Sequence, residues 1–155
     1  MTRYIVIVLF RACECIIFNM TVDKVLILSS AIIKNADEEI LLLERGETKT
    51  FQGHWQLPEG KMEEAEKPVE ALRREMKEEL DLEIDSFELE TVTQNELEAK
   101  GMKYLAVRLV FSTKLKDGEI TLSHEHSDYR WVKVSEVDGM KLLPGTRETI
   151  DAVLG

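Results

Sequence analysis

The chain has 155 residues, of which 44% are hydrophobic and 32% are charged, and its net charge is −10. This length suits one domain with a full hydrophobic core, and the composition is typical of a globular protein. The acidic balance argues against a general nucleic-acid binder, which needs a basic patch. It does not exclude a nucleotide as the ligand, because a bound divalent cation would neutralise an acidic site.

The first 19 residues differ in character from the rest of the chain. Their apolar run, residues 4–10, is too short to cross a membrane, and the small-residue cleavage site of a signal peptide is missing. The segment could add an edge strand, but our preferred hypothesis is that Met20 is the functional start. Residues 1–19 would then be an extension outside the native fold, and residues 20–155 the functional domain.

The two cysteines point to a reducing compartment. Cys13 and Cys15 are too close together for a disulfide framework, and no partners stand at zinc-ligand spacing. We therefore expect a cytoplasmic protein.

Hydrophobic patterning predicts a mixed α/β domain. The expected strands are residues 25–33, 40–44, 87–97, 103–115 and 129–134. The first two form a hairpin around a turn at residues 35–37, and a second turn is expected at residues 116–119. The expected helices are residues 68–80 and 144–154. Strands on both sides of one central helix, closed by a terminal helix, predict an α/β/α sandwich around a mixed sheet.

The central helix carries three crowded carboxylates. Glu75, Glu78 and Glu79 lie at positions i, i+3 and i+4, so they share one helix face, at the rim of the apolar stripe. Like charges this close repel one another unless a cation lies between them, and Mg²⁺ prefers oxygen ligands of this kind. A solvated charged face would carry the same residues, so the spacing around the helix decides between the two interpretations.

That spacing resembles the Nudix box of the Nudix hydrolase family, G-x5-E-x7-R-E-U-x-E-E-x-G-U with U aliphatic. Residues 60–82 match its specified polar and first glycine positions with Gly60, Glu66, Arg74, Glu75, Glu78 and Glu79. The preceding segment, GHWQLPEG, is similar to the family's GxWxLPGG, and the likeness extends over roughly residues 25–154.

Two residues depart from the family pattern. Asp81 stands where the box has its second glycine, just past the helix. We expect it to adopt the left-handed conformation there, at a cost on the order of 1 kcal/mol. Glu59 replaces a glycine beside the presumed metal-binding carbonyl of Gly60, where it could alter the loop geometry or add a ligand.

The resemblance implies an enzyme that hydrolyses a nucleoside diphosphate linked to a further group, with water attacking phosphorus and Mg²⁺ or Mn²⁺ assisting. It implies a metal site made of Glu75, Glu78, Glu79 and the Gly60 carbonyl. It also implies that Arg74 orients a catalytic glutamate through a charge-assisted hydrogen bond. Glu75 and Glu78 are both catalytic candidates, and the identity of the general base stays open because family members differ.

Two positions outside the box have familial counterparts. Arg45 stands where many relatives carry a phosphate-binding arginine, and a surface arginine near a turn is the alternative. Glu125, in SHEHSDYRWV, resembles a late EHxEYRW segment that often supplies a further metal ligand or base, and an exposed loop acid is the alternative. The histidines are expected at loops or at the substrate's edge, since Mg²⁺ favours oxygen over imidazole. Trp55 and Trp131 are expected to pack.

Substrate choice must be sought outside the box. The downstream segment NELEAKGMK lacks the proline of some ADP-ribose hydrolases and the tyrosine of diadenosine-polyphosphate hydrolases. This favours a MutT-like pyrophosphatase that converts a nucleoside triphosphate to the monophosphate and pyrophosphate. The alternatives are hydrolysis of ADP-ribose or a dinucleoside polyphosphate, a silent nucleotide-binding regulator, and a structural acidic protein. A small nucleotide is the expected partner, without nucleic acid or membrane, and a homodimer is left open.

Overall fold

The computed structural model describes residues 4–6, 18–20, 22–47, 49–115 and 118–155. Its strands are β1 (Tyr4–Val6), β2 (Phe18–Met20), β3 (Lys24–Lys34), β4 (Ile40–Arg45), β5 (Trp55–Gln56), β6 (Glu59–Lys61), β7 (Glu88–Ala99), β8 (Met102–Lys114) and β9 (His126–Val132). The helices are α1 (Pro68–Leu80), the 3₁₀ helix η1 (Val134–Gly139) and α2 (Thr146–Leu154).

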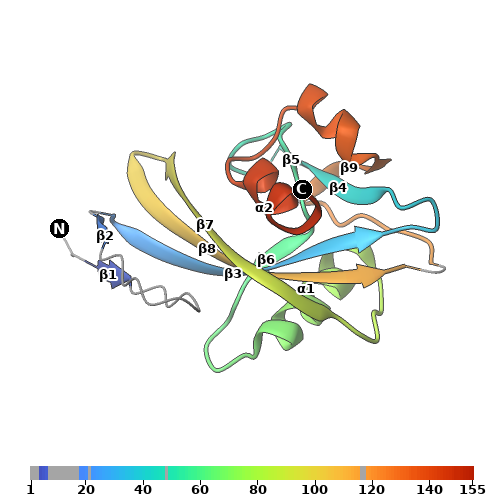
Figure 1. Cartoon of the computed structure of the whole chain (residues 1–155), viewed down its shortest axis with the longest axis horizontal. Helices are drawn as coiled ribbons and strands as arrows, with labels where there is room; N and C mark the ends of the chain where they lie inside the picture. Colours follow the sequence, from blue (N-terminus) through green and yellow to red (C-terminus); the bar gives the residue numbers. More distant parts are fainter. Residues whose placement is uncertain (1–3, 7–17, 21, 48, 116–117) are drawn as a thin grey trace.

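Seven strands form one mixed sheet (Figure 1). Its order is β5-β4-β3-β8-β7, with β6 also paired to β3 and β9 also paired to β4. The strands β3 and β8 run parallel along their whole length, whereas the other pairs are antiparallel. The predicted mixed sheet is confirmed.

The predicted hairpin of β3 and β4 is joined only near its turn. The two strands pair at Lys34 and Ile40, beside a turn in which the Asn35 side chain accepts hydrogen bonds from two backbone N–H groups. Beyond that point residues 55–61 run between them, so that β5 pairs with β4 and β6 pairs with β3. The splayed hairpin therefore brings the segment that ends in Gly60 into the sheet.

Alternating side chains give the sheet a core on each face. One core lies under α1 and contains Ala31, Ile33, Leu41, Leu43, Leu72, Met76, Leu80, Leu82 and Phe111. The other lies under η1 and α2 and contains Ile32, Ile40, Leu42, Trp55, Leu57, Val110, Val132, Val137 and Ile150. Helices on both faces (Figure 1) confirm the predicted α/β/α sandwich.

Several boundaries differ from the predictions. The strands β5 and β6 and the helix η1 were not among the predicted elements. The strands have only two and three residues, too few to show a period. The strand β9 begins at His126, three residues before the predicted start at Tyr129. Half of the predicted turn at residues 116–119 lies outside the described residues.

Most of the segment before Met20 lies outside the described residues. Its two short strands, β1 and β2, pair with each other in a separate two-stranded sheet. That residues 1–19 are dispensable for the fold stays a prediction. Within the described residues, no helix is both long and apolar enough to span a membrane.

The C-terminus of α1 confirms the expectation for Asp81. This residue has φ 54° and ψ 31°, the left-handed conformation that the family's glycine adopts without cost. Its N–H donates to the Lys77 carbonyl at 3.1 Å, and the N–H of Leu82 donates to the Met76 carbonyl at 3.1 Å. Both bonds satisfy carbonyls that the end of a helix leaves open.

Replacing Asp81 separately by glycine and alanine tests this cap. Because alanine keeps the steric penalty of a Cβ at positive φ, we expect Asp81→Gly to exceed Asp81→Ala in free energy of unfolding by about 1 kcal/mol. Urea denaturation of the two variants measures the difference. Equal stabilities would contradict the strained cap.

Candidate active site

Gly60, on β6, allows the side chain of Glu75 to lie against the backbone of the sheet. It pairs with Ser29 in the β3–β6 ladder, and the side chain of Glu75 on α1 lies directly against it. A Cβ added at Gly60 would overlap the carboxylate carbon of Glu75. Only glycine leaves room for the carboxylate in this position.

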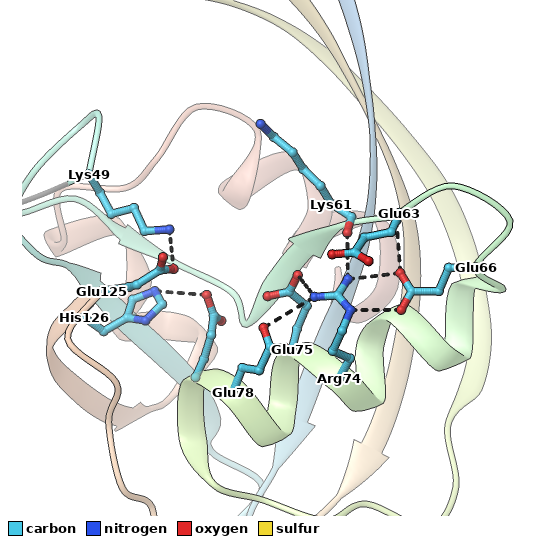
Figure 2. Close-up of polar contacts among 10 residues, drawn as sticks. Lys49, Lys61, Glu63, Glu66, Arg74, Glu75, Glu78, Glu125 and His126 are labelled. Carbon is cyan, nitrogen blue, oxygen red and sulfur yellow. Dashed lines mark hydrogen bonds and ion pairs between the residues drawn. The ribbon is translucent and has the colours of Figure 1, made fainter.

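Arg74 connects the loop before α1 to the acidic face of the helix (Figure 2). Its Nε and Nη2 donate to the two carboxylate oxygens of Glu66 at 2.9 and 3.0 Å. Its Nη1 donates to Glu75 Oε1 at 2.7 Å, and Nη2 also donates to the Lys61 carbonyl at 3.1 Å. One guanidinium thus fixes Glu75 relative to the loop through the planar geometry that arginine provides.

The three glutamates of the helix face have different surroundings. Glu79 is buried, with 5% of its surface exposed, and its Oε2 has no hydrogen-bond partner among the described residues. Glu75 is partly buried beside Arg74, whereas the Glu78 side chain is 62% exposed and lies 3.5 Å from Arg74 Nη1. The carboxylates therefore range from buried and unpaired to solvent-exposed.

Burial controls the ionisation of two of these groups. It raises the pKa of Glu79 to about 8, and the negative charges of Glu75 and Glu125 add to the effect. Burial also raises the pKa of Glu75, but the hydrogen bond and charge of Arg74 oppose that rise. A cation near Glu79 would reverse the penalty on its charged form.

His126 is a neighbour of Glu79 that the sequence did not place there. It is buried on β9, where its Nε2 lies 3.9 Å from Glu79 Oε1, too far for a hydrogen bond. Its Nδ1 has no hydrogen-bond partner in the part of the chain that the structure describes. Burial and the positive charges of Lys49 and Arg45 lower the pKa of His126 to about 4, so its ring is neutral. The early start of β9 is what brings this side chain inside.

Arg45 and Glu125 face the same cavity as the three glutamates. Arg45, at the end of β4, donates from Nε to the Thr50 carbonyl at 2.6 Å and from Nη1 to Gln56 Oε1, and burial lowers its pKa. Glu125 precedes β9 and pairs with Lys49 (Figure 2), whose charge lowers the pKa of the carboxyl. Both residues therefore line the same cavity as Gly60, Glu75, Glu78 and Glu79.

The cavity has a volume of about 610 Å³. It is lined by Leu28, Arg45, Lys49, Thr50, Gln56, Glu59, Gly60, Lys61, Glu75, Glu78, Glu79, Ser123, His124, Glu125 and His126. Its acidic side chains come from β6, α1 and the loop before β9, and its basic side chains come from β4, the loop that follows it and β6.

Comparison with known proteins identifies the family, because residues 28–153 match the NUDIX domain. The chain belongs to the Nudix family. It is 28% identical over 126 residues to the nucleoside triphosphatase NudI of Klebsiella pneumoniae, a match that covers 77% of this chain and 89% of that protein.

Solved structures agree with this Nudix assignment. The crystal structure of a MutT protein from Methanosarcina mazei has a TM-score of 0.70 and 31% identity, covering 84% of this chain and 94% of that one. A MutT Nudix hydrolase from Burkholderia pseudomallei has a TM-score of 0.71 and 26% identity, covering 83% and 98% respectively. The protein is a Nudix pyrophosphohydrolase with the α/β fold of these neighbours.

The donors of this Nudix site fit a divalent cation. Three carboxylates and a backbone carbonyl are hard oxygen ligands, and the partnerless Oε2 of Glu79 is a buried acceptor that a cation would satisfy. In the described part of the chain no three acidic or histidine side chains already converge on one point. The reason is that Arg74 draws Glu75 and Glu78 toward itself.

Glu59, which we expected to alter the loop geometry or to add a ligand, forms a buried ion pair with Arg108. Arg108 Nε donates to Glu59 Oε2 at 2.8 Å. The hydroxyl of Ser30 donates to the same oxygen. Sequence reasoning missed this pair because Arg108 lies 49 positions away on β8.

The raised pKa of Glu79 predicts a stability that depends on pH in the absence of divalent cations. The folded state holds the Glu79 proton up to about pH 8, whereas the unfolded chain loses it near pH 4.5. The free energy of unfolding should therefore fall as pH rises toward 8. The lowered pKa of His126 gives the opposite slope below its ordinary value of 6.5, so the test window is from pH 6.5 to about 8.

Urea denaturation in EDTA across this window provides the measurement. We expect Glu79→Gln, which keeps the shape but cannot ionise, to flatten the slope. The exposed Glu83→Gln serves as the matched control and should leave it unchanged. A slope that persists in Glu79→Gln would contradict the assignment.

Proposed function

We propose that this Nudix enzyme hydrolyses a nucleoside triphosphate to the monophosphate and pyrophosphate with Mg²⁺ or Mn²⁺. The observation that carries the proposal is that acidic and basic side chains line one cavity of about 610 Å³. The carboxylates of α1 suit a cation, and Arg45 and Lys61 suit phosphate oxygens. The likeness to NudI, a nucleoside triphosphatase by its name, and to the MutT proteins supports this substrate class.

Glu75, Glu78, Glu79 and the Gly60 carbonyl would hold the metal. When bound, a divalent cation would screen the phosphate charges and lower the pKa of a water ligand. Ionisation of buried Glu79 becomes favourable under these conditions, since the cation offsets the cost of burial. Arg74 keeps the Glu75 carboxylate beside Gly60 throughout.

Two carboxylates outside the buried position are suited to accept a proton from the attacking water. Glu78 is exposed to the solvent side of the cavity, and Glu125 is held ionised by Lys49 on the far side. Glu75 is already engaged by Arg74, which favours its charged form. We assign catalysis to Glu75, Glu78 and Glu125 together with Arg74. Kinetic measurements on variants of the three glutamates would identify which of them accepts the proton.

Arg45 would bind a phosphate group of the substrate. Its Nε and Nη1 are committed to the Thr50 carbonyl and Gln56, which fix the orientation of the guanidinium plane at the cavity wall. Because a fixed guanidinium loses little entropy when it binds an anion, this arrangement suits recognition of phosphate. Lys49 lies on the same wall, although Glu125 partly neutralises it.

A nucleotide panel tests the proposed reaction. Nucleoside triphosphates, ADP-ribose and dinucleoside polyphosphates are incubated with the protein and Mg²⁺ or Mn²⁺, and the products are separated by chromatography. We expect triphosphates to give monophosphate and pyrophosphate. Preferential cleavage of another substrate class, or of none, would contradict the proposal.

Glu78→Gln removes a carboxylate without changing the volume of the side chain. We expect kcat/KM to fall about 100-fold or more, since both metal binding and proton transfer depend on the charge. Glu83→Gln is the matched control, because Glu83 lies just beyond α1 with an 84% exposed side chain. Equal values of kcat/KM for the two variants would show that Glu78 has no role in the reaction.

Thermal melting reports metal binding without turnover. Because a ligand that binds only the folded state stabilises it, we expect Mg²⁺ to raise the Tm of the unmodified protein as its concentration increases. The increase should be much smaller in Glu79→Gln and unchanged in Glu83→Gln. If neither Mg²⁺ nor Mn²⁺ changes the Tm of the unmodified protein, the result would argue against the metal site.

A further inference from the structure

A second cavity, about 300 Å³ in volume, adjoins the phosphate cavity. The two share Leu28, Arg45, Thr50, Glu59 and Lys61 in their walls. The rest of the second cavity is largely apolar and includes Leu26, Phe51, Leu97, Tyr104 and Leu143. A mostly apolar cavity with a few fixed polar groups is typical of a site for an aromatic ligand.

Two polar groups of this cavity, Glu59 and Arg108, form one buried pair. Their side chains are 9% and 2% exposed. Arg108 also donates to Asn95 Oδ1 and to the Pro144 carbonyl, so its own N–H groups are directed to protein acceptors. The pair is therefore fixed by contacts from three other segments of the chain.

The two oxygens of the Glu59 carboxylate are unequally engaged. Oε2 accepts from Ser30 and from Arg108 Nε, whereas among the described residues Oε1 has only a long contact of 3.5 Å with Arg108 Nη2. A carboxylate oxygen can accept two hydrogen bonds. Oε1 thus keeps the capacity to accept a proton donor from a ligand.

Phe51 supplies an aromatic wall under backbone strain. Its φ of 62° is unusual for a bulky residue, and such conformations persist where the surrounding structure enforces them, often at binding sites. A hydrogen bond holds the backbone beside Phe51, because Arg45 Nε donates to the carbonyl of the preceding residue, Thr50. Tyr104, on β8, is a second aromatic residue of the same cavity.

We propose that the second cavity binds the nucleobase, and that Glu59, held by Arg108, selects bases carrying an exocyclic amino group. This inference rests on the proposed function, since it places the base beside the cavity that takes the phosphates. Glu59 is a specificity-determining residue in this account. Glu59 stands where the family's lead-in quoted above has glycine.

The preference for an amino group follows from the charge of the acceptor. Guanine, adenine and cytosine each present an amino N–H donor, which the negative carboxylate of Glu59 would accept. Thymine and uracil present a carbonyl oxygen at the corresponding position of the pyrimidine ring, and two acceptors repel. A site built to accept a hydrogen bond rejects the analogue that lacks the donor, because its buried polar group is then left unpaired.

Arg108 makes a carboxylate tolerable at this place. An unpaired charge at Glu59 would repel the phosphates in the shared cavity and would be costly to bury. The guanidinium offsets the negative charge while leaving Oε1 weakly engaged. The ion pair therefore serves recognition without adding net charge next to the phosphates.

The discriminating experiment compares cytosine with uracil, which differ in size very little. Binding of CMP and UMP to the unmodified protein and to Glu59→Gln is measured by calorimetry, and kcat/KM is measured for the corresponding triphosphates. We expect the unmodified protein to favour cytosine about tenfold or more in both assays, as a hydrogen bond to a charged group implies. In Glu59→Gln the ratio should fall to near one, since an amide can also donate to the uracil carbonyl.

The control and the contrary outcomes keep this inference separate from the proposed function. Glu64→Gln, an exposed acid in the loop before α1, should preserve the cytosine preference. Cytosine selectivity in CMP binding without triphosphate hydrolysis would support the base site and overturn the proposed reaction. Hydrolysis of both triphosphates at equal kcat/KM by the unmodified protein would overturn the base site and leave the reaction standing. A preference for cytosine that is unchanged in Glu59→Gln would likewise overturn the base site and leave the reaction standing.

Discussion

The bond between Arg74 and its two glutamates is the interaction on which the site depends. Three carboxylates within one helical turn repel one another, and this repulsion would spread them apart in water. Arg74 offsets it on one side by binding Glu66 through both oxygens and Glu75 through one. Arg74 thereby holds the loop before α1 and the end of β6 to the helix that carries the acids. The side of the carboxylates that faces away from Arg74 is left for a cation.

The sheet supplies the second half of this arrangement. Since β3 and β4 separate beyond their turn, the segment at residues 55–61 can enter between them and set Gly60 against Glu75. The same segment contributes Glu59 to the adjoining apolar cavity. One short insertion in the sheet therefore connects the proposed metal site to the cavity proposed for the base. This explains how a phosphate chain and a nucleobase could be held in a fixed relation.

Local patterns predicted the features that depend on local order. The buried run of β3, the alternation of β8, the helical spacing of Glu75, Glu78 and Glu79, and the left-handed Asp81 follow from residues close together in sequence. The strands β5 and β6 could not be predicted, because pairing with β4 and β3 rather than their own composition makes them strands. The burial of His126 and the Glu59–Arg108 pair depend likewise on contacts between distant segments, and a single sequence carries no signal for them.

A double-mutant cycle between Glu66 and Arg74 tests the central claim most directly. Glu66→Gln and Arg74→Lys each disturb the two-oxygen pairing, and we expect each to lower kcat/KM for the preferred triphosphate about 10- to 100-fold, as loss of a positioning contact does. If the two residues act as one unit, the double variant should be little worse than the more impaired single variant. Losses that multiply in the double variant would show independent roles and contradict the account.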